Sequence, residues 1–306
     1  MKRTLAVVLT AVALAAACGD DTTATDTTAA DTTSDDGSPD APQRIVSLSA
    51  TSTEMLFAIG AGDQVVAVDS MSNHPPEAPM TDLSAYEPNV EAIATYDPDL
   101  VVLDATDPDL ISGLETLGIE VMEAPAAATL EDTYAQLEEL GEVTGHVDDA
   151  DDVVAGMRSD IDAALDGLPE RDEPLTYYPE LDDTLFSVTS ETFIGELYTL
   201  AGLENVADPA DADGQSGGYP QLSTEYLVQT DPDLVFLADT KCCAQTAETF
   251  AARPGFSALT AVEDDRVILL DDDIASRWGP RVVDLLEQIV EAVSGIDDDM
   301  EEADAA

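Results

Sequence analysis

Residues 96–103 read YDPDLVVL, and residues 230–237 read TDPDLVFL. Each copy is a short apolar run introduced by Asp-Pro-Asp, which is typical of a buried strand in a parallel sheet. At the same spacing, Glu91 ahead of the first copy matches Glu225 ahead of the second. A solenoid would repeat about every 20–50 residues. This repeat occurs once and at a far greater distance, so it predicts two similar lobes.

Outward from the repeat, short β-rich runs alternate with helix signals. A capping box at residues 51–54, an Asp107-Pro108 start and a stop at Gly118 mark helices in the first half. Residues 191–201 predict a helix in the second half. This rhythm indicates mostly parallel sheets with helices on both faces. The expected strands are residues 45–49, 65–69, 100–104, 120–123, 176–178, 234–238 and 267–270.

Between the two halves, residues 148–168 place apolar side chains at steps of three and four, as a helix with one buried face does. Such a helix would be roughly 30 Å long. We therefore expect an α/β fold of two Rossmann-like lobes joined by one long α-helix, with a ligand cleft between the lobes. A rigid helical joint predicts a small closing motion. A last helix is expected from about Ile274 to Val293.

The first residues have the pattern of an export signal. Lys2 and Arg3 precede the uncharged apolar residues 5–17, and small residues lead into Cys18. That apolar run is too short to span a bilayer and fits a signal peptide. We expect a lipoprotein signal peptide over residues 1–17 and lipidation of Cys18, with plain secretion as the alternative. Residues 18–42 have no large apolar side chain, which predicts a disordered tether.

The rest of the chain is long enough for two modest domains. We expect an N-terminal lobe over residues 43–147, the connecting helix over 148–168, a C-terminal lobe over 169–296 and an acidic tail over 297–306. An exported and anchored chain would lie on the outer face of the cytoplasmic membrane, or in the periplasm.

The charge of the chain excludes some partners. The sequence has 66 Asp and Glu against 10 Lys and Arg, a formal net charge of −56. Such a surface repels nucleic acid and anionic lipid. Self-repulsion of this size must be screened by salt or cations, which favours a saline habitat. An acidic surface that steers a ligand is the alternative, although the acids are spread along the whole chain.

Three stretches carry a family resemblance. Residues 44–49 read RIVSLS ahead of Thr53-Glu54, residues 72–78 read SNHPPEA, and the Asp-Pro-Asp-Leu repeat follows. In order and spacing they resemble the helical-backbone solute-binding proteins of ABC importers for iron–siderophores, haem and cobalamin. The resemblance covers nearly all of residues 43–295 and is strongest to the cobalamin-binding branch. It implies that a monomer captures a metal chelate, a corrinoid or an iron–siderophore, and delivers it to an ABC permease and its ATPase.

The resemblance also suggests ligand contacts. Asp273 and Arg277, followed by Pro280-Arg281, match the C-terminal loop of the cobalamin-binding branch, where the first two would contact polar groups of the ligand. Tyr86 and Tyr219 would form aromatic walls, and Met71 and Val188 stand where that branch has aromatic residues. Independently, ligands of open α/β sheets sit beyond the carboxyl ends of strands. That rule adds the strand-end loops, namely residues 49–51 with Ser49 and Thr51, residues 70–74 with His74, Thr106, and residues 240–243.

Glu91 and Glu225 have two interpretations. They are first-turn glutamates stabilised by a helix dipole, or they dock the chain on its permease, as one glutamate per lobe does in the family that the chain resembles. The duplication favours docking, in which charge pairs set orientation and encounter rate.

The adjacent pair Cys242-Cys243 has three interpretations. They are a vicinal disulfide, a soft-metal site, or two small packing residues. Export favours the disulfide. The chain has only two histidines, His74 and His146, too few for a typical zinc site, and no metal or cofactor is expected.

We identify no nucleophile elbow, P-loop or dinucleotide-binding glycine motif, and therefore expect no catalytic residue. An extracytoplasmic enzyme or ligand-sensing domain on the same two-lobed fold is the alternative to a binding protein.

Overall fold

The computed structural model of the chain describes residues 41–104, 107–169, 171 and 173–305, with side chains up to residue 296. The predicted signal peptide, the lipidation of Cys18, nearly all of the tether, the acidic tail's side chains and the predicted contact of Thr106 lie outside these limits. No helix in the described ranges is long and apolar enough to cross a membrane.

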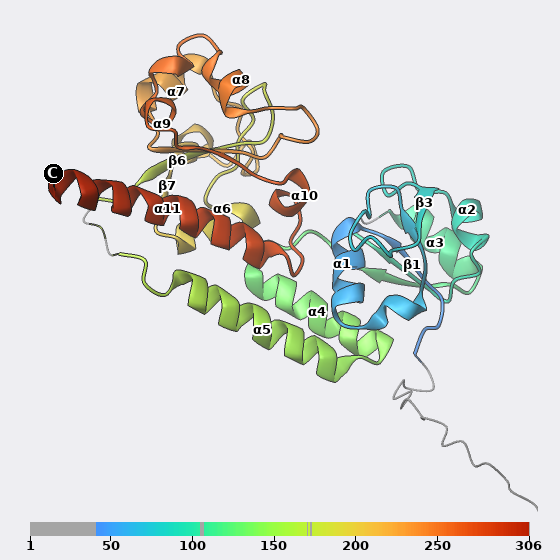
Figure 1. Cartoon of the computed structure of the whole chain (residues 1–306). Coiled ribbons are helices and arrows are strands. Elements are labelled where there is room, and N and C mark those ends of the chain that lie inside the picture. The colour runs from blue at the N-terminus through green and yellow to red at the C-terminus, as the bar shows by residue number, and fades with distance from the viewer. Residues whose placement is uncertain (1–40, 105–106, 170, 172, 306) are drawn as a thin grey trace, which may run out of the picture. The chain divides into compact units, whose positions relative to one another are not determined.

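The first sheet has five parallel strands in the order β3-β2-β1-β4-β5 (Figure 1). Its central strands are buried along their whole length, as their apolar sequence predicts. The strands are β1 (Ile45–Leu48), β2 (Val65–Asp69), β3 (Met80–Leu83), β4 (Leu100–Leu103) and β5 (Glu120–Glu123). They are connected through α1 (Ala50–Ala58), η1 (Ala61–Gln64), α2 (Val90–Ala94) and α3 (Pro108–Thr116).

The second sheet has four parallel strands in the order β7-β6-β8-β9. They are β6 (Thr176–Glu180), β7 (Glu204–Asn205), β8 (Leu234–Leu237) and β9 (Val267–Leu269). The intervening helices are α6 (Phe193–Leu200), η2 (Asp208–Asp211), α7 (Thr224–Thr230), α8 (Ala247–Ala251), η3 (Phe256–Ala258), α9 (Thr260–Glu263) and α10 (Asp272–Ala275). Two parallel sheets with helices confirm the predicted α/β class. The strands that had been predicted agree within two residues at each end, and β3 and β7 were missed.

The sequence repeat forms the same turn and the same strand contact in both sheets. Asp97 and Asp231 adopt positive φ angles of 51° and 47°, which turn the chain out of the preceding helix. The next aspartate then accepts hydrogen bonds from the start of a neighbouring strand. Asp99 accepts from the amides of Gln43 and Arg44 at 2.8 and 2.9 Å. Asp233 accepts from the amide of Thr176 at 2.8 Å. The motif therefore fixes the strand order β1-β4 in one lobe and β6-β8 in the other.

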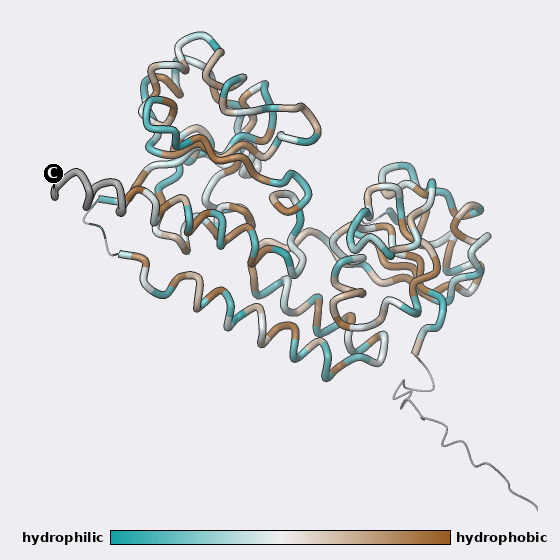
Figure 2. Tube along the Cα trace, viewed as in Figure 1, coloured by the Kyte–Doolittle hydropathy of each residue, from teal (hydrophilic) through white to brown (hydrophobic). Residues whose placement is uncertain are grey.

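Three long helices pack beside the sheets. The predicted connecting helix is α5 (Val147–Leu165), and α4 (Leu130–Thr144), which was not predicted, packs along it. Gly141 permits this close approach, since a Cβ there would lie 2.5 Å from the Cβ of Ala150. The third helix, α11 (Val282–Ala305), packs on α5 and α6. Figure 2 shows that the apolar residues gather along the strands and on one side of these helices.

The predicted continuous helix from Ile274 to Val293 is wrong. The chain forms the single turn α10, leaves the helix at Ser276, and enters α11 only at Val282. Pro280 explains the break, because a proline cannot donate its amide to a helical carbonyl and disfavours a helical residue before it. The non-helical loop, residues 276–281, carries Arg277 and Trp278.

Candidate functional site

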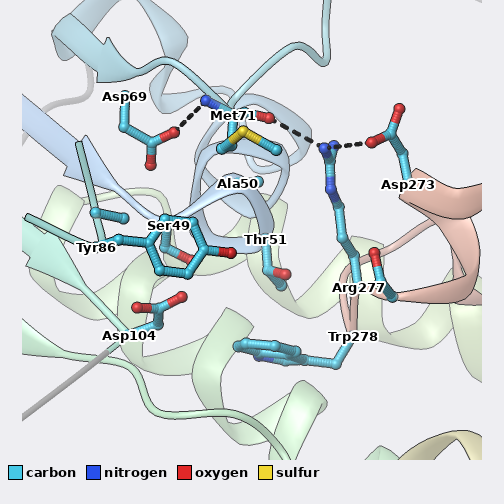
Figure 3. A pocket seen from close by; sticks show the side chains of 12 residues that line it. Ser49, Ala50, Thr51, Asp69, Met71, Tyr86, Asp104, Asp273, Arg277 and Trp278 are labelled. Carbon is cyan, nitrogen blue, oxygen red and sulfur yellow. Dashed lines mark hydrogen bonds and ion pairs between the residues drawn. The ribbon is translucent and has the colours of Figure 1, made fainter. Parts of the chain in front are cut away.

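A cavity of about 460 Å³ lies at the carboxyl end of the first sheet (Figure 3). The end of each of four neighbouring strands contributes to it: Ser49 follows β1, Met71 follows β2, Tyr86 follows β3 and Asp104 follows β4. The remaining wall is Asp273 and residues 276–278. The chain leaves β1 toward β2 on one side and returns to β4 on the other. This is the topological switch point at which open α/β sheets bind ligands.

Arg277 joins the loop of residues 276–281 to the first lobe. The residue is largely buried, with an exposed fraction of 8%. One end of its guanidinium donates to Glu54 Oε1 at 2.7 Å. The other end donates to the carbonyl of Met71 at 3.1 Å and to Asn73 Oδ1 and Asp273 Oδ1, each at 3.0 Å (Figure 3). Arg277 lines the cavity as predicted, but both its terminal nitrogens already donate to acceptors within the protein.

Glu54 was misassigned in the sequence. It was predicted to close a capping box, whereas the N-cap of α1 is Ser49, which accepts from the amide of Ser52 at 3.2 Å. The Glu54 carboxylate is instead buried and accepts from Arg277 and also from Arg281 Nε at 2.8 Å. A Thr-x-x-Glu pattern gives no sign of such partners, because both arginines lie more than 200 positions away.

Asp273 is the carboxylate on the opposite side of the guanidinium. It also accepts from Lys241 Nζ at 2.7 Å and from Asn73 Nδ2 at 3.1 Å. Burial alone would raise its pKa, but the hydrogen bonds from Lys241 and Asn73 hold the pKa of Asp273 below the usual value. Asp273 is therefore ionised and paired, and it still lines the cavity.

Two further carboxylates in the cavity were not predicted. Asp69 is 1% exposed, and its Oδ1 accepts from the amides of Met71 and Ser72 at 2.6 and 3.0 Å. Its Oδ2 has no hydrogen-bond partner among the described residues. Burial raises the pKa of Asp69, and burial together with the charge of Asp69 raises the pKa of Asp104. Both aspartates are the last residues of their predicted strands, and the candidates taken from the sequence were in the loops that follow those strands.

The apolar part of the cavity comes from Tyr86, Met71 and Trp278. Tyr86 is 85% exposed and Met71 is also exposed, so their faces are open to a ligand. Trp278 is held in place, since its Nε1 donates to Gln136 Oε1 at 3.0 Å and its carbonyl accepts from Thr133 at 2.9 Å. It is the only tryptophan in the chain and was not predicted to line the site.

Six of the predicted ligand contacts line this cavity: Ser49, Thr51, Met71, Tyr86, Asp273 and Arg277. His74, Val188, Tyr219 and residues 240–243 do not. His74 lines a separate cavity of about 240 Å³ with Glu54 and Arg281. Val188 is fully buried, with its carbonyl bonded to Asn205 Nδ2 at 2.8 Å. Tyr219 is exposed outside the cavity.

The sequence also matches known proteins. Residues 45–274 match the family described as periplasmic binding protein. This chain belongs to the periplasmic binding protein family. It is therefore a solute-binding protein of the type that serves ABC importers and not an enzyme, as predicted.

This binding protein is similar to proteins of known class. YvrC of Bacillus subtilis, an ABC transporter substrate-binding lipoprotein, is 28% identical over 82% of this chain and 80% of its own. The cobalamin-binding protein of Halobacterium salinarum is 29% identical over 82% of this chain and 69% of its own. The structure of the haem-binding protein HutB of Vibrio cholerae superposes with a TM-score of 0.71 at 22% identity, covering 81% of this chain and 98% of that one. The last likeness concerns the fold alone.

One serine pattern in the binding protein was overlooked. Residues 214–218 read GQSGG, which has the spacing of a nucleophile elbow. A functional elbow lies between a strand and a helix. Ser216 instead lies in an exposed turn after η2, and its amide donates to Asp211. The pattern is a loop in this protein.

Glu91 and Glu225 occupy matching places. Each is exposed and is the second residue of its helix, α2 or α7. The helices begin alike, with Asn89 and Ser223 each accepting from the amide three residues on. Their docking role stays a prediction.

Cys242 and Cys243 are free and exposed in the structure, and the vicinal disulfide stays a prediction. Asp272 accepts from the amides of Lys241 and Cys242 at 2.9 and 2.8 Å, which anchors the start of this loop. The hydrogen bond with Cys243, burial and the nearby Asp272 raise the pKa of Cys242 to about 12. A thiolate, the form that binds metals, is therefore disfavoured. Among the described residues there is no group of three His, Cys, Asp or Glu suited to a metal ion.

Proposed function

We propose that this protein is an extracytoplasmic solute-binding protein, anchored through a lipid on Cys18, that captures a corrinoid and passes it to an ABC permease. An iron–siderophore is the alternative cargo. The observation that carries the proposal is the cavity at the switch point of the first sheet, with Tyr86, Met71 and Trp278 as apolar walls and a few fixed polar groups. A large chelate ring needs apolar area together with a small number of polar anchors.

What the similar proteins are named for supports a corrinoid as the cargo. A relative that matches over most of this chain is the cobalamin-binding protein of Halobacterium salinarum. Docking to the permease would use Glu91 and Glu225, and the protein would act as a monomer. The lipid anchor is supported by the run of small residues before Cys18 and by the lipoprotein relative from Bacillus subtilis.

A panel of thermal unfolding curves tests the cargo. The purified protein is heated in molar NaCl with cyanocobalamin, haemin or a ferric hydroxamate in excess. A ligand present at a hundred times its Kd should add about 2.7 kcal/mol to the free energy of unfolding. We expect the largest rise of the midpoint with cyanocobalamin. A rise with the ferric hydroxamate alone would replace the corrinoid by a siderophore, and no rise with any chelate would refute the proposal.

A further inference from the structure

We propose that Asp69 and Asp104 form an acidic floor in the cavity that selects chelates with N–H groups or positive charge along their edge and rejects chelates with a carboxylate edge. This inference rests on the proposed function, because it specifies which chelates the same cavity accepts.

One carboxylate oxygen of Asp69, Oδ2, accepts no hydrogen bond from the described part of the chain. Oδ1 of Asp69 is fixed by two backbone amides, of Met71 and Ser72. Its Oδ2 is buried without a partner among the described residues, although nearly all buried polar atoms in proteins are hydrogen-bonded. Figure 3 shows Asp69 and Asp104 on the side of the cavity where Tyr86 lies, with Tyr86 drawn between them in this view. A ligand N–H that enters there would satisfy Oδ2.

The charges around the cavity leave this floor uncompensated. Arg277 is the cation that acts on Asp69, but its guanidinium is shared among Glu54, Asp273 and two neutral acceptors. Lys241 is bound to Asp271 and Asp273. Within the described part of the chain, neither Asp69 nor Asp104 has an ion-pair partner. A carboxylate brought beside them would find two like charges and no free cation, which is how an unpaired charge rejects the wrong ligand.

Asp69→Asn tests this selectivity with little risk to the fold. The asparagine Oδ1 can keep both backbone hydrogen bonds, and only the unpartnered oxygen becomes an N–H donor. The matched control is Asp239→Asn in the other lobe. Asp239 is also fully buried, and both its oxygens lack partners, but it does not line the cavity. A double variant, Asp69→Asn with Asp104→Asn, removes the whole floor.

Each protein is titrated at one salt concentration with cyanocobalamin, which has an edge of neutral amides, with cobinamide, which is cationic, and with haemin, which has carboxylates. We expect the wild type to prefer the two corrinoids. Asp69→Asn should weaken their binding by about tenfold or more, since a hydrogen bond to a charged group is lost. Haemin binding should strengthen in the double variant, and Asp239→Asn should change none of these affinities.

One result would overturn the inference while leaving the proposed function standing, namely a corrinoid-to-haemin affinity ratio that is the same in the wild type and in the double variant. A wild type that binds haemin more tightly than either corrinoid would overturn both the inference and the corrinoid cargo. Failure of the wild type to bind any of the three chelates would instead refute the proposed function, and the acidic floor with it.

Discussion

At the scale of single residues, three of the chain's few arginines form ion pairs with buried carboxylates. Glu54 is bound by Arg277 and Arg281, and Glu180 accepts a two-point hydrogen bond from Arg253 at 2.6 and 2.7 Å. A buried carboxylate that loses such a partner is costly, because the charge remains without compensation. These arginines therefore contribute to the fold first.

Arg277→Ala should destabilise the protein by about 1.5–3 kcal/mol, since it removes a charged hydrogen bond from a buried acid that keeps one other arginine. The sequence predicted Arg277 only as a ligand contact, whereas its ion pair with the buried Glu54 gives it a role in the fold. Urea unfolding followed by circular dichroism measures the change. The control is Arg158→Ala, whose partner Glu131 is mostly exposed and which should cost little. Equal losses in both variants would contradict the role of burial.

The buried Asp239 should make the stability of the fold depend on pH. Burial, with the charge of Glu180 added, raises the pKa of Asp239 from 3.8 to about 7. Between these values the folded protein holds a proton that the unfolded chain has released, so stability falls as pH rises through this window. The slope from one group is at most about 1.4 kcal/mol per pH unit, and it vanishes above the folded pKa.

Asp239→Asn should remove this contribution. The unfolding midpoint of the variant should exceed that of the wild type at about pH 8, and the gap should shrink toward about pH 4, where the wild-type carboxyl is protonated in the folded protein and begins to take up its proton in the unfolded chain. Thermal unfolding across this range in molar NaCl measures the gap. A gap that is constant with pH would show that Asp239 titrates normally in the folded protein.

At the scale of elements, the sequence predicted what local patterns encode. The strands β1, β4 and β8 are apolar runs, and the connecting helix has a regular apolar face, so both were found. The strand β3 was missed because Met80 and Leu83 are its only apolar residues and Met80 is exposed. Site residues in the loops that follow a strand were mostly predicted. Features set by contacts between distant segments were missed, namely the burial of Glu54 and the helix break before Pro280.

The pair α2 and α7 carries the docking prediction. Glu91→Ala combined with Glu225→Ala should leave chelate affinity unchanged and reduce association with the permease, because both glutamates are exposed and neither lines the cavity. Uptake into membrane vesicles and pull-down of the permease are the measurements. As a control, Asp109→Ala with Glu248→Ala removes one exposed first-turn acid from each lobe outside the repeat. Lost chelate affinity with normal permease association would refute the prediction.

At the scale of the whole molecule, the net charge of −56 dominates. Exposed like charges repel one another in the compact state, and the repulsion is reduced only when the screening length falls below the distance between them. Buried pairs such as Glu54 with Arg277 are screened far less. Salt should therefore act on the surface and leave the site's geometry in place.

The unfolding midpoint should rise with NaCl well beyond the range that screens an ordinary protein surface, and continue to rise toward molar concentrations. Thermal unfolding at several NaCl concentrations tests this, with sucrose as a control for general stabilisation. A midpoint that is flat from low to molar salt would contradict the prediction.

Calorimetric titration with cyanocobalamin decides whether the cavity beside Tyr86 binds a corrinoid, as we propose. Tyr86 is 85% exposed, so Tyr86→Ala should leave the fold unchanged and remove only the ligand's aromatic contact. Removing such a contact should weaken binding by about tenfold, the equivalent of about 1.4 kcal/mol. We predict one-to-one binding by the wild type and the weaker binding by the variant. Binding of equal strength in both would place the corrinoid elsewhere, and no binding by the wild type would contradict the account.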